Sequence, residues 1–391
     1  MEEWKECKLG EIATITKLAG FEFTKYIKYN ETGEIIALRA LNLRNGRLDL
    51  TEVKHIDKSV SDALPRSKLY KGEILFTYTG NGYGDCALVD EDDKYHLAPN
   101  ICKISPNKKI ADSNFLFQTI RSNAFYKQVS NYIGGSSQPT IPMETIRQLK
   151  VKLPPLSTQQ KIAAILSSLD DKIELNNKIN TNHEQQAQAL FKNWFVDFEP
   201  FGGKMPEGWK VGKLSDIAEI TMGQSPDGKS YNENGEGTVF YQGRAEFGTR
   251  FPTRRLFTTE PKRIAKKLDT LMSVRAPVGD LNIANEDCCI GRGLAAIHSK
   301  DRHQSFVHYT VVFLRPQLDV FNGEGTVFGC INREALNNME VIIPSKIDLD
   351  KFEKIVTTMD IDIFNRSEEN DRLKNIRDTL LPKLMNGEIE V

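Results

Sequence analysis

The sequence predicts an α+β protein in which two similar domains, each a twisted β-sheet with helices, are joined by two long antiparallel coiled-coil helices in a pseudo-twofold, cyclic arrangement. Two observations lead to this prediction: an internal repeat, and a long helical segment that follows each copy of it. The chain has 391 residues, which suits two or three domains of roughly 100–200 residues. We expect a first domain over 1–155, a central long helix over 156–200, a second domain over 201–345 and a C-terminal long helix over 346–391.

The two halves of the chain share blocks of sequence in the same order. The block "WKECKLGEIATIT" (4–16) aligns without gaps with "WKVGKLSDIAEIT" (209–221), and eight of its thirteen positions are identical. A second pair, "IPMETIRQLKVKLP" (141–154) and "INREALNNMEVIIP" (331–344), also aligns without gaps. Between these blocks the similarity falls to scattered patches. We therefore infer a duplicated domain whose interior has diverged.

Each domain is expected to contain many short strands, because short apolar runs alternate with Gly, Pro, Asn and Asp. The segments 72–79, 271–279 and 339–344 have the composition of strands, while 113–129 and 305–318 show helical spacing. Strands and helices mixed in this way favour the α+β class.

The segment after Pro155 runs without Gly or Pro until Pro200. Its seam positions recur in alternating steps of four and three, and the same pattern returns in the segment that follows the second domain. A heptad repeat sustained over more than four heptads is the signature of a coiled coil. The apolar seam residues are Ile162, Leu166, Leu169, Ile173, Leu190 and Trp194 in the first segment, and Phe352, Val356, Met359, Ile363, Leu373, Leu380 and Leu384 in the second.

The middle of the first seam is polar, with Asn176, Asn180 and His183 in place of apolar residues. Polar seam residues cost stability but help to fix register and partner number. A rotation that exchanges the two halves must also exchange the two helices, so we expect the helices to run antiparallel. The same symmetry would bring Val391 close to Met1.

The ends of both helices carry recognisable signals. Ser157 or Thr158 is the expected N-cap of the first helix, and the second helix is expected to stop near Pro382 and Gly387. The 32 steps from the first to the last seam residue of the first helix correspond to about 48 Å at 1.5 Å per residue.

Composition excludes several classes of protein. No run of about 18 apolar residues is present, so a membrane span is not expected. The sequence after Met1 lacks a basic region followed by an apolar stretch, so we expect a cytoplasmic protein. The six cysteines form no CxxC pair and are expected to be reduced and partly buried. His298, His303 and His308 recur every five residues, which does not suit zinc, and no metal site is predicted.

One segment matches a nucleotide-binding pattern by its letters alone. "GQSPDGKS" (223–230) fits GxxxxGK[ST], which would assign Lys229 to a phosphate. That mechanism needs a helix to begin at the loop, but the turn-rich "YNENGEG" follows. We expect a tight loop there and no cofactor in this chain.

The charge distribution is more informative than the net charge of −1. Both predicted helices are acidic, with net charges of −2 over 157–200 and −3 over 346–391, which leaves +4 on the remainder. The segment 244–267 has eight basic and two acidic residues, and 39–71 has eight basic and four acidic residues. Such segments suit contacts with DNA phosphates and base edges, with an ordinary solvated surface as the alternative.

Several stretches resemble the specificity subunits of type I restriction-modification systems. They are "LPPLSTQQKIAAILSSLDDKIELNN", the repeated W-K-x-x-K-L-x-x-I-A-x-I-T, "ITMGQSPDGKSYN", "GGSSQPTIP" and "IRDTLLPKLMNGEI". The resemblance covers essentially the whole chain, and its helix motifs are quite specific. It also weakens the nucleotide-binding interpretation of 223–230, because that segment is familiar as a turn of the family.

The resemblance implies a non-catalytic subunit that addresses and scaffolds a larger complex. Each domain would recognise one half of a bipartite, asymmetric site in double-stranded DNA. Two modification subunits would bind the chain and methylate adenines with S-adenosylmethionine. Restriction subunits that use ATP and Mg²⁺ could join them.

The base-contacting residues are expected on polar loops, because recognition domains diverge where specificity lies. The candidates are Tyr78, Asn81, Tyr83, Ser136, Ser137 and Gln138 in the first domain, and Gln242, Arg244, Arg250, Arg254, Arg255 and Arg275 in the second. Arginine is favoured in the second set because its contact with guanine is the commonest specific one. Two alternatives remain open at this point: a coiled-coil scaffold that never binds DNA, and ATP hydrolysis through Lys229.

Overall fold

The computed structural model divides the chain into two units: one contains Met1–Leu175 and Asn370–Val391, and the other Asn176–Glu369. The dividing points fall inside the two long helices, α7 (Leu156–Phe195) and α12 (Lys346–Met385), so each unit contains part of both. The residues that the structure describes are 4–80, 82–132, 139–323 and 329–391.

The first unit is built around a four-stranded antiparallel sheet with the strand order β2-β10-β7-β8. A smaller sheet has the order β6-β3-β9, with β3 and β9 parallel, and β1 pairs with β11. The strands are β1 (Lys5–Lys8), β2 (Ala13–Lys17), β3 (Ile35–Leu38), β4 (Leu43–Arg44), β5 (Arg47–Leu48), β6 (Lys54–Ile56), β7 (Ile74–Thr77), β8 (Cys86–Leu88), β9 (Tyr95–Leu97), β10 (Ile101–Pro106) and β11 (Lys150–Leu153). The helices that precede α7 are α1 (Leu9–Ile12), α2 (Gly20–Tyr26), α3 (Lys58–Ala63), α4 (Ser113–Arg121), α5 (Asn123–Ser130) and α6 (Met143–Gln148).

The second unit repeats this plan. Its four-stranded sheet has the order β13-β21-β18-β19, β12 pairs with β22, and β15 runs parallel to β20. The strands are β12 (Lys210–Lys213), β13 (Ala218–Met222), β14 (Tyr231–Asn232), β15 (Thr238–Tyr241), β16 (Phe257–Thr258), β17 (Ile264–Ala265), β18 (Thr270–Ser273), β19 (Leu281–Ile283), β20 (Cys288–Ile290), β21 (Leu294–Ser299) and β22 (Glu340–Ile343). The helices between α7 and α12 are α8 (Leu214–Ile217), α9 (Gln304–Phe313), α10 (Arg315–Asp319) and α11 (Arg333–Asn337).

The predicted duplication is confirmed at the level of topology. The matched blocks fold into the same elements, since β1, α1 and β2 of the first unit correspond to β12, α8 and β13 of the second. The four-stranded sheets have the same strand order when equivalent strands are compared. The two units differ in the smaller sheet, which has three strands in the first unit and five in the second. Divergence is therefore concentrated outside the shared framework.

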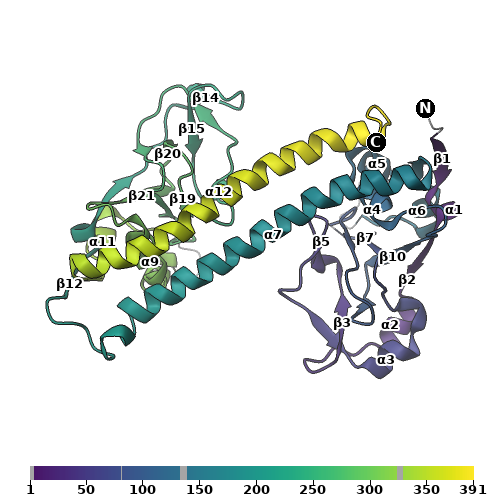
Figure 1. The fold of residues 1–391 in the computed structure, drawn as a ribbon, viewed down its shortest axis with the longest axis horizontal. Helices are drawn as coiled ribbons and strands as arrows, with labels where there is room; N and C mark the ends of the chain where they lie inside the picture. Colours follow the sequence, from purple (N-terminus) through teal and green to yellow (C-terminus); the bar gives the residue numbers. More distant parts are fainter. Residues whose placement is uncertain (1–3, 81, 133–138, 324–328) are drawn as a thin grey trace. The chain divides into compact units, whose positions relative to one another are not determined.

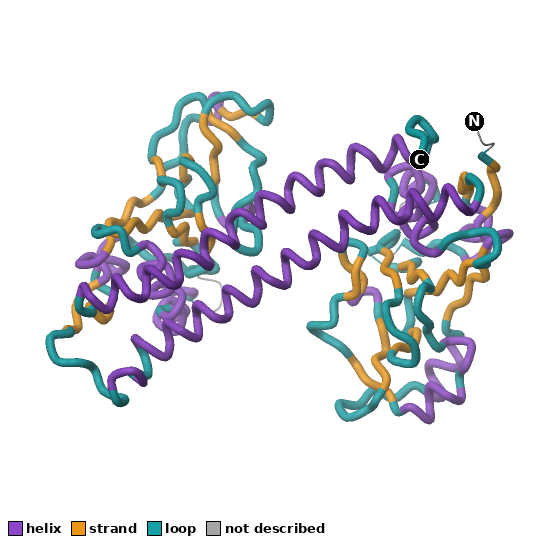
Figure 2. Tube along the Cα trace, viewed as in Figure 1, coloured by secondary structure: helices purple, strands orange, loops and turns teal. Residues whose placement is uncertain are grey.

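Helices α7 and α12 lie side by side and run in opposite directions, as the ribbon and the tube show (Figures 1 and 2). In the first unit Asp170 of α7 binds Arg377 of α12 at 2.7 Å. In the second, His183 lies 3.0 Å from Asp362, and the ring of Phe195 is centred 5.0 Å from that of Phe352. As the residue number rises along α7, the number of its partner on α12 falls. The antiparallel pairing predicted from the repeat is therefore confirmed.

The predicted apolar seam residues of both helices are all buried or half-buried. The seam does not include the most buried aromatic residues at the end of α7, which are Phe191 and Phe195. Both rings pack against Phe306 of α9. At this end α7 therefore packs on the domain as well as on α12, and a heptad pattern alone does not predict the second contact.

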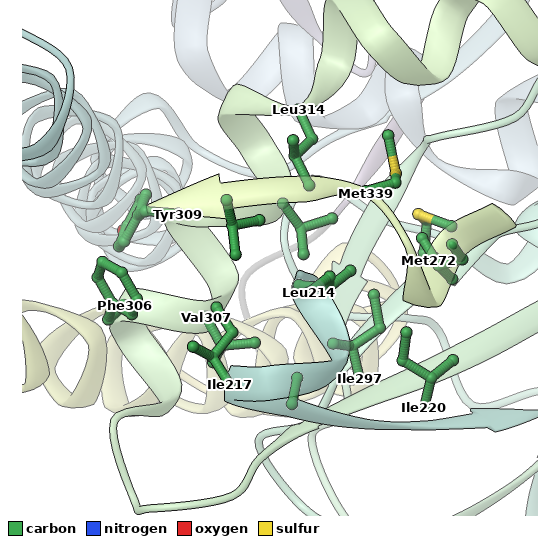
Figure 3. Close-up of a cluster of buried hydrophobic side chains, with 14 of the residues drawn as sticks. Leu214, Ile217, Ile220, Met272, Ile297, Phe306, Val307, Tyr309, Leu314 and Met339 are labelled. Carbon is green, nitrogen blue, oxygen red and sulfur yellow. The ribbon is translucent and has the colours of Figure 1, made fainter. Parts of the chain in front are cut away.

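The core of the second unit lies between the four-stranded sheet and the helices. Figure 3 shows Ile220, Met272 and Ile297 from the sheet strands facing Val307 and Leu314, which belong to α9 and its C-terminal end. All five side chains are buried. The strands have this apolar composition because one face of the sheet must be covered by helices to remove it from water.

Two local predictions were wrong in detail, and one was confirmed. The helix expected over 113–129 is two helices, because Ser122 is extended (ψ 148°) and its side chain accepts a hydrogen bond from the backbone N–H of Phe125. The expected N-caps Ser157 and Thr158 lie inside α7, which begins at Leu156. The predicted end of the second helix is confirmed, since α12 ends at Met385, between Pro382 and Gly387.

The C-terminal segment packs onto the hydrophobic core of the first unit. Leu384 is buried in the same hydrophobic cluster as Ile162, and Val391 packs against that cluster. The indole of Trp4 lies against Gly387, where an added Cβ would approach Trp4 Nε1 to 2.9 Å. Gly387 has a positive φ of 71°, which favours glycine at the end of a helix. Met1 is outside the described residues, so the expected closeness of the termini is seen from Trp4 onwards.

The described residues can be examined for membrane-spanning helices and for the state of the cysteines. None of the helices described there has both the length and the apolar composition needed to cross a membrane. All six cysteines are described, and all are free thiols. Burial raises the pKa of Cys86 and of Cys102 to about 12, so neither is a reactive thiolate at neutral pH.

Candidate DNA interface

One edge of the second unit brings together loops that follow three different strands. The parallel strands β15 and β20 end side by side, and the backbone N–H of Gly291 donates to the carbonyl of Tyr241 at 2.8 Å. The N–H of Val274, just after β18, donates to the carbonyl of Gly293 at 2.9 Å. These bonds place the residues that follow, including Gln242 and Arg275, at one edge.

Gln242 and Arg275 are the two predicted residues at this edge of the second unit. Both side chains are exposed. Arg275 forms an isolated β-bridge with Cys330, which fixes its backbone. Within the described part of the chain, neither side chain has a carboxylate partner. Their polar groups are therefore available to a ligand from outside the chain.

Three other predicted arginines lie on the surface but are already paired. Arg244 forms an ion pair with Asp280, and Arg254 forms one with Glu286 on one side and Glu368 on the other. Arg255 binds Glu246 at 2.9 Å and Glu233 at 3.4 Å. Each would have to exchange an internal carboxylate for a phosphate or a base, which lowers the net gain from binding DNA.

Arg250 is in a different environment, with only 10% of its side chain exposed. It forms ion pairs with Asp360 of α12 and Glu184 of α7, and its Nη1 donates to the hydroxyl of Tyr309 at 3.3 Å. Ser305 of α9 also donates to Asp360, at 2.6 Å. The structure thus uses Arg250 to attach the second domain to both long helices. DNA contact by this residue stays an untested prediction.

Asp170 of α7 makes the equivalent attachment in the first unit, at the position of the repeat that corresponds to Asp360. It accepts hydrogen bonds from Gln118 and Arg121 of α4, both at 2.9 Å, and from Arg377 of α12 at 2.7 Å. Burial would raise the pKa of Asp170, but the two guanidinium groups and Gln118 together lower it below its ordinary value. We call these two groups, centred on Asp170 and Asp360, the aspartate clasps.

Two of the predicted residues of the first unit, Tyr78 and Tyr83, lie on the corresponding loop after β7. Tyr83 stacks on Tyr126, with ring centres 6.0 Å apart and hydroxyl oxygens 3.2 Å apart. Tyr78 is half-buried, and Lys17 Nζ lies 5.2 Å from the centre of its ring. Aromatic and basic side chains at one edge could contact DNA bases and phosphates. The other four predicted residues, Asn81, Ser136, Ser137 and Gln138, lie outside the described residues.

The phosphate-loop pattern at 223–230 has no helix behind it. A short 3₁₀ turn, Gly228–Ser230, leads into β14, and the N–H of Lys229 donates to the side chain of Asp227 at 2.9 Å. The backbone amide that a phosphate would require is therefore bound to a carboxylate. Among the described residues, no group of three or more His, Cys, Asp or Glu side chains is placed to hold a metal ion.

Comparison with known proteins identifies both halves of the chain. The profile of the type I restriction modification DNA specificity domain matches residues 1–185 and 206–374. The type I restriction enzyme MjaX specificity subunit of Methanocaldococcus jannaschii is 30% identical, over 100% of this chain and 94% of the relative. The HindI specificity subunit of Haemophilus influenzae is 27% identical over 100% of both chains.

A solved structure shares the fold at low sequence identity. The S subunit of a type I restriction-modification system from M. genitalium superimposes with a TM-score of 0.67 and 15% identity, covering 98% of this chain and 96% of that one. Two matched domains, two long helices and similarity along the full chain agree with one another. The chain therefore belongs to the specificity subunits of type I restriction-modification systems and has two DNA recognition domains.

Proposed function

We propose that each recognition domain reads one half of a bipartite, asymmetric DNA site. The observation that carries this proposal is a shared four-stranded framework with different loops at the same edge. Two domains with one framework can present themselves to DNA in the same way, while their different side chains select different bases. The edge beyond β15, β18 and β20 in the second unit, and its counterpart beyond β3, β7 and β9 in the first, would contact the half-sites.

The paired helices would set the length of the unspecified spacer between the half-sites. Each helix has 40 residues, which is about 60 Å of α-helix at 1.5 Å per residue. This length is of the same order as the distance between successive major grooves on one face of DNA, which is about 34–36 Å. The acidic net charge of both helices makes them poor binders of DNA phosphates. Their part in recognition would be to hold the domains apart.

Catalysis would reside in partner subunits. Two modification subunits would bind this chain, flip the target adenine out of the duplex and methylate it with S-adenosylmethionine. Restriction subunits that use ATP and Mg²⁺ would cleave DNA. This chain would supply the address and the scaffold, with no cofactor of its own.

Mapping methylated adenines in genomic DNA, with and without this chain, tests the proposal. Co-expression with its modification subunit should give one bipartite sequence motif, and omission of the chain should abolish it. A scaffold that never binds DNA would give methylation that lacks a bipartite motif. Hydrolysis of ATP by the isolated chain, lost in Lys229→Ala, would support the enzyme alternative instead.

The long helices expose apolar side chains that suit contact with partner subunits. Ile165 and Ile355 are 38% and 43% exposed and occupy equivalent positions of the repeat on α7 and α12. An unpaired carboxylate in an interface with a partner subunit costs on the order of several kcal/mol of binding free energy. We expect Ile165→Glu and Ile355→Glu each to weaken association with a modification subunit at least tenfold.

Measurement of that association needs a matched surface control. Gln185→Glu introduces the same charge at another exposed position of α7 and should leave association unchanged. Thermal unfolding of the free chain should be nearly the same for all three variants, because each site is on the surface. Unchanged affinity in both isoleucine variants would assign modification-subunit binding to another surface.

A further inference from the structure

A short loop between β20 and β21 holds an arginine at the edge already described. The loop is Gly291-Arg292-Gly293, and the side chain of Arg292 is exposed while Gly291 is buried. The backbone N–H of Arg292 lies 3.4 Å from the hydroxyl oxygen of Ser225. Sequence reasoning did not select Arg292, because it stands alone in an apolar segment and not in a basic cluster.

The two glycines allow the loop to lie directly on the residue after β15. A Cβ on Gly291 would come within 2.8 Å of the carbonyl oxygen of Gln242 and 2.9 Å of its Cα. A Cβ on Gly293 would come within 3.0 Å of the same oxygen. Because these contacts are with backbone atoms, a larger residue would push the loop away. Arg292 is therefore held beside Gln242 by close backbone packing.

Arg275 joins the same group through the backbone. Its neighbour Val274 donates to the carbonyl of Gly293 at 2.9 Å, and Ile331 N–H donates back to the carbonyl of Val274 at 3.1 Å. Gln242, Arg275 and Arg292 thus follow three different strands and meet at one edge. We call these three residues the edge triad.

The two arginines of the edge triad differ in their charge balance from the other arginines predicted to contact DNA. Arg244, Arg250 and Arg254 all form ion pairs with carboxylates of this unit. Across the described residues, Arg275 and Arg292 have no such ion pair. Two unneutralised guanidinium groups beside an exposed amide suit a ligand that offers acceptors, as the edges of DNA bases do.

The first recognition domain has different chemistry at the three equivalent positions. Ala98 N–H donates to the carbonyl of Leu38 at 3.0 Å, and Tyr78 N–H to that of Asn100 at 3.0 Å, so the backbone pattern is the same. The residues at the equivalent positions are Arg39, Thr79 and Pro99. Arg39 is paired with Glu52 at 3.4 Å. A shared backbone frame with exchanged side chains is the arrangement expected where two domains read different bases.

We propose that Arg292 is a specificity-determining residue that reads a guanine of the second half-site, together with Arg275 and Gln242. Arginine pairs with the O6 and N7 acceptors of guanine, and glutamine pairs with adenine. The second half-site should therefore contain a G·C pair that this edge reads. This inference rests on the proposed function, since it assigns the bases of one half-site to particular side chains.

The test compares Arg292→Ala and Arg292→Lys in the complete complex with the modification subunit. Methylated adenines are mapped by sequencing genomic DNA, and binding to the mapped site is measured over a range of salt concentrations. Both variants should relax one G·C position of the second half-site, with a loss of discrimination of about 10- to 100-fold. Lysine should not rescue specificity, because it cannot form the paired hydrogen bonds of a guanidinium group.

The control is Arg302→Ala. Arg302 is also exposed and lies beyond the opposite end of β21, after Ser299. It should change neither half-site. The first half-site should be unchanged in every variant, and this retained half-site separates failure of the inference from failure of the proposed function.

Two outcomes would overturn the inference while leaving the bipartite motif intact. Uniformly weaker binding of Arg292→Ala with a shallower salt dependence, restored by lysine, would show a phosphate contact that carries no sequence information. An unchanged motif and affinity would show that this edge does not touch DNA. Thermal unfolding near the wild-type temperature would confirm that Arg292→Ala leaves the fold intact.

Discussion

Insertion of one heptad into each long helix is expected to lengthen the DNA spacer by about three base pairs and to leave both half-sites unchanged. Seven residues add about 10.5 Å of helix, and each base pair of B-DNA occupies about 3.4 Å. A heptad restores the phase of the seam almost completely, so the faces that meet stay the same. The edges of the two domains that would contact the half-sites are not altered by the insertion.

The division of the chain into units identifies where the insertions belong. They should be placed between Leu175 and Asn176 in α7, and between Glu369 and Asn370 in α12. At these points the internal contacts of both units are retained, including the bond from Asn176 to Glu369 at 2.7 Å. The mapped methylation motif is the measurement. A changed half-site together with an unaltered spacer would contradict the role of the helices as a ruler.

A one-sided insertion is the matched control. A heptad in α7 alone leaves α12 seven residues short, so the polar pairs of the seam can no longer all form. These include His183 with Asp362 and Asn180 with Ser367. We expect this variant to lose methylation or to unfold at lower temperature. Retention of a normal motif would indicate that the two helices need not have equal lengths.

Asp170→Asn is expected to destabilise the first unit by about 3 kcal/mol. The substitution removes the charge that pairs with Arg121 and Arg377 but keeps the volume of the side chain, and a partly buried cation without its partner is costly. Asp170 is 18% exposed, so screening by water is limited. Calorimetry should show an unfolding transition at lower temperature, while Asp171→Asn, at an exposed neighbouring position, should match the wild type.

The pH dependence of this effect has a definite sign. The pKa of Asp170 is lowered in the folded state, so its contribution is present above the ordinary aspartate pKa of about 3.9 and is lost as the pH falls through the folded value. Asp170→Asn should therefore lose less stability on acidification than the wild type does. An equal loss in both proteins would mean that Asp170 does not contribute through its charge.

Substitutions in the two aspartate clasps are expected to affect recognition of different half-sites. Asp170→Asn should disturb the first half-site and Asp360→Asn the second, because each aspartate holds only the domain of its own unit. Relaxed recognition of both half-sites by either variant would indicate that the clasps act on the helix pair as a whole.

The framework was predictable from sequence where the signal was local or repeated. The tryptophan-containing blocks at 4–16 and 209–221 differ at only five of thirteen positions, and they fold into the same strand, helix and strand. The heptad spacing depends only on neighbouring residues, and it placed Ile162 and Phe352 in a buried seam. Duplication then gave the antiparallel direction by symmetry.

The interface was harder to predict because its contacts are remote in sequence. Nothing around Arg250 indicates that Asp360, 110 residues later, will neutralise it. Arg292 could not be predicted from its sequence neighbours, because they are apolar. Its position in the fold depends on the two flanking glycines, which contact Gln242. Composition can find clusters of charge, but only the fold shows which charges are already paired.

The first unit is assembled from both ends of the sequence, and this has a consequence for synthesis on the ribosome. Residues 176–369 form the second unit from one continuous stretch, so it can fold as soon as that stretch has emerged. The first domain is translated earlier, but part of its apolar surface stays uncovered until Leu384 and the segment up to Val391 have been synthesised. If synthesis stops within α12, the second domain would therefore be folded while the apolar surface of the first domain stays exposed. Proteases could recognise that exposed surface.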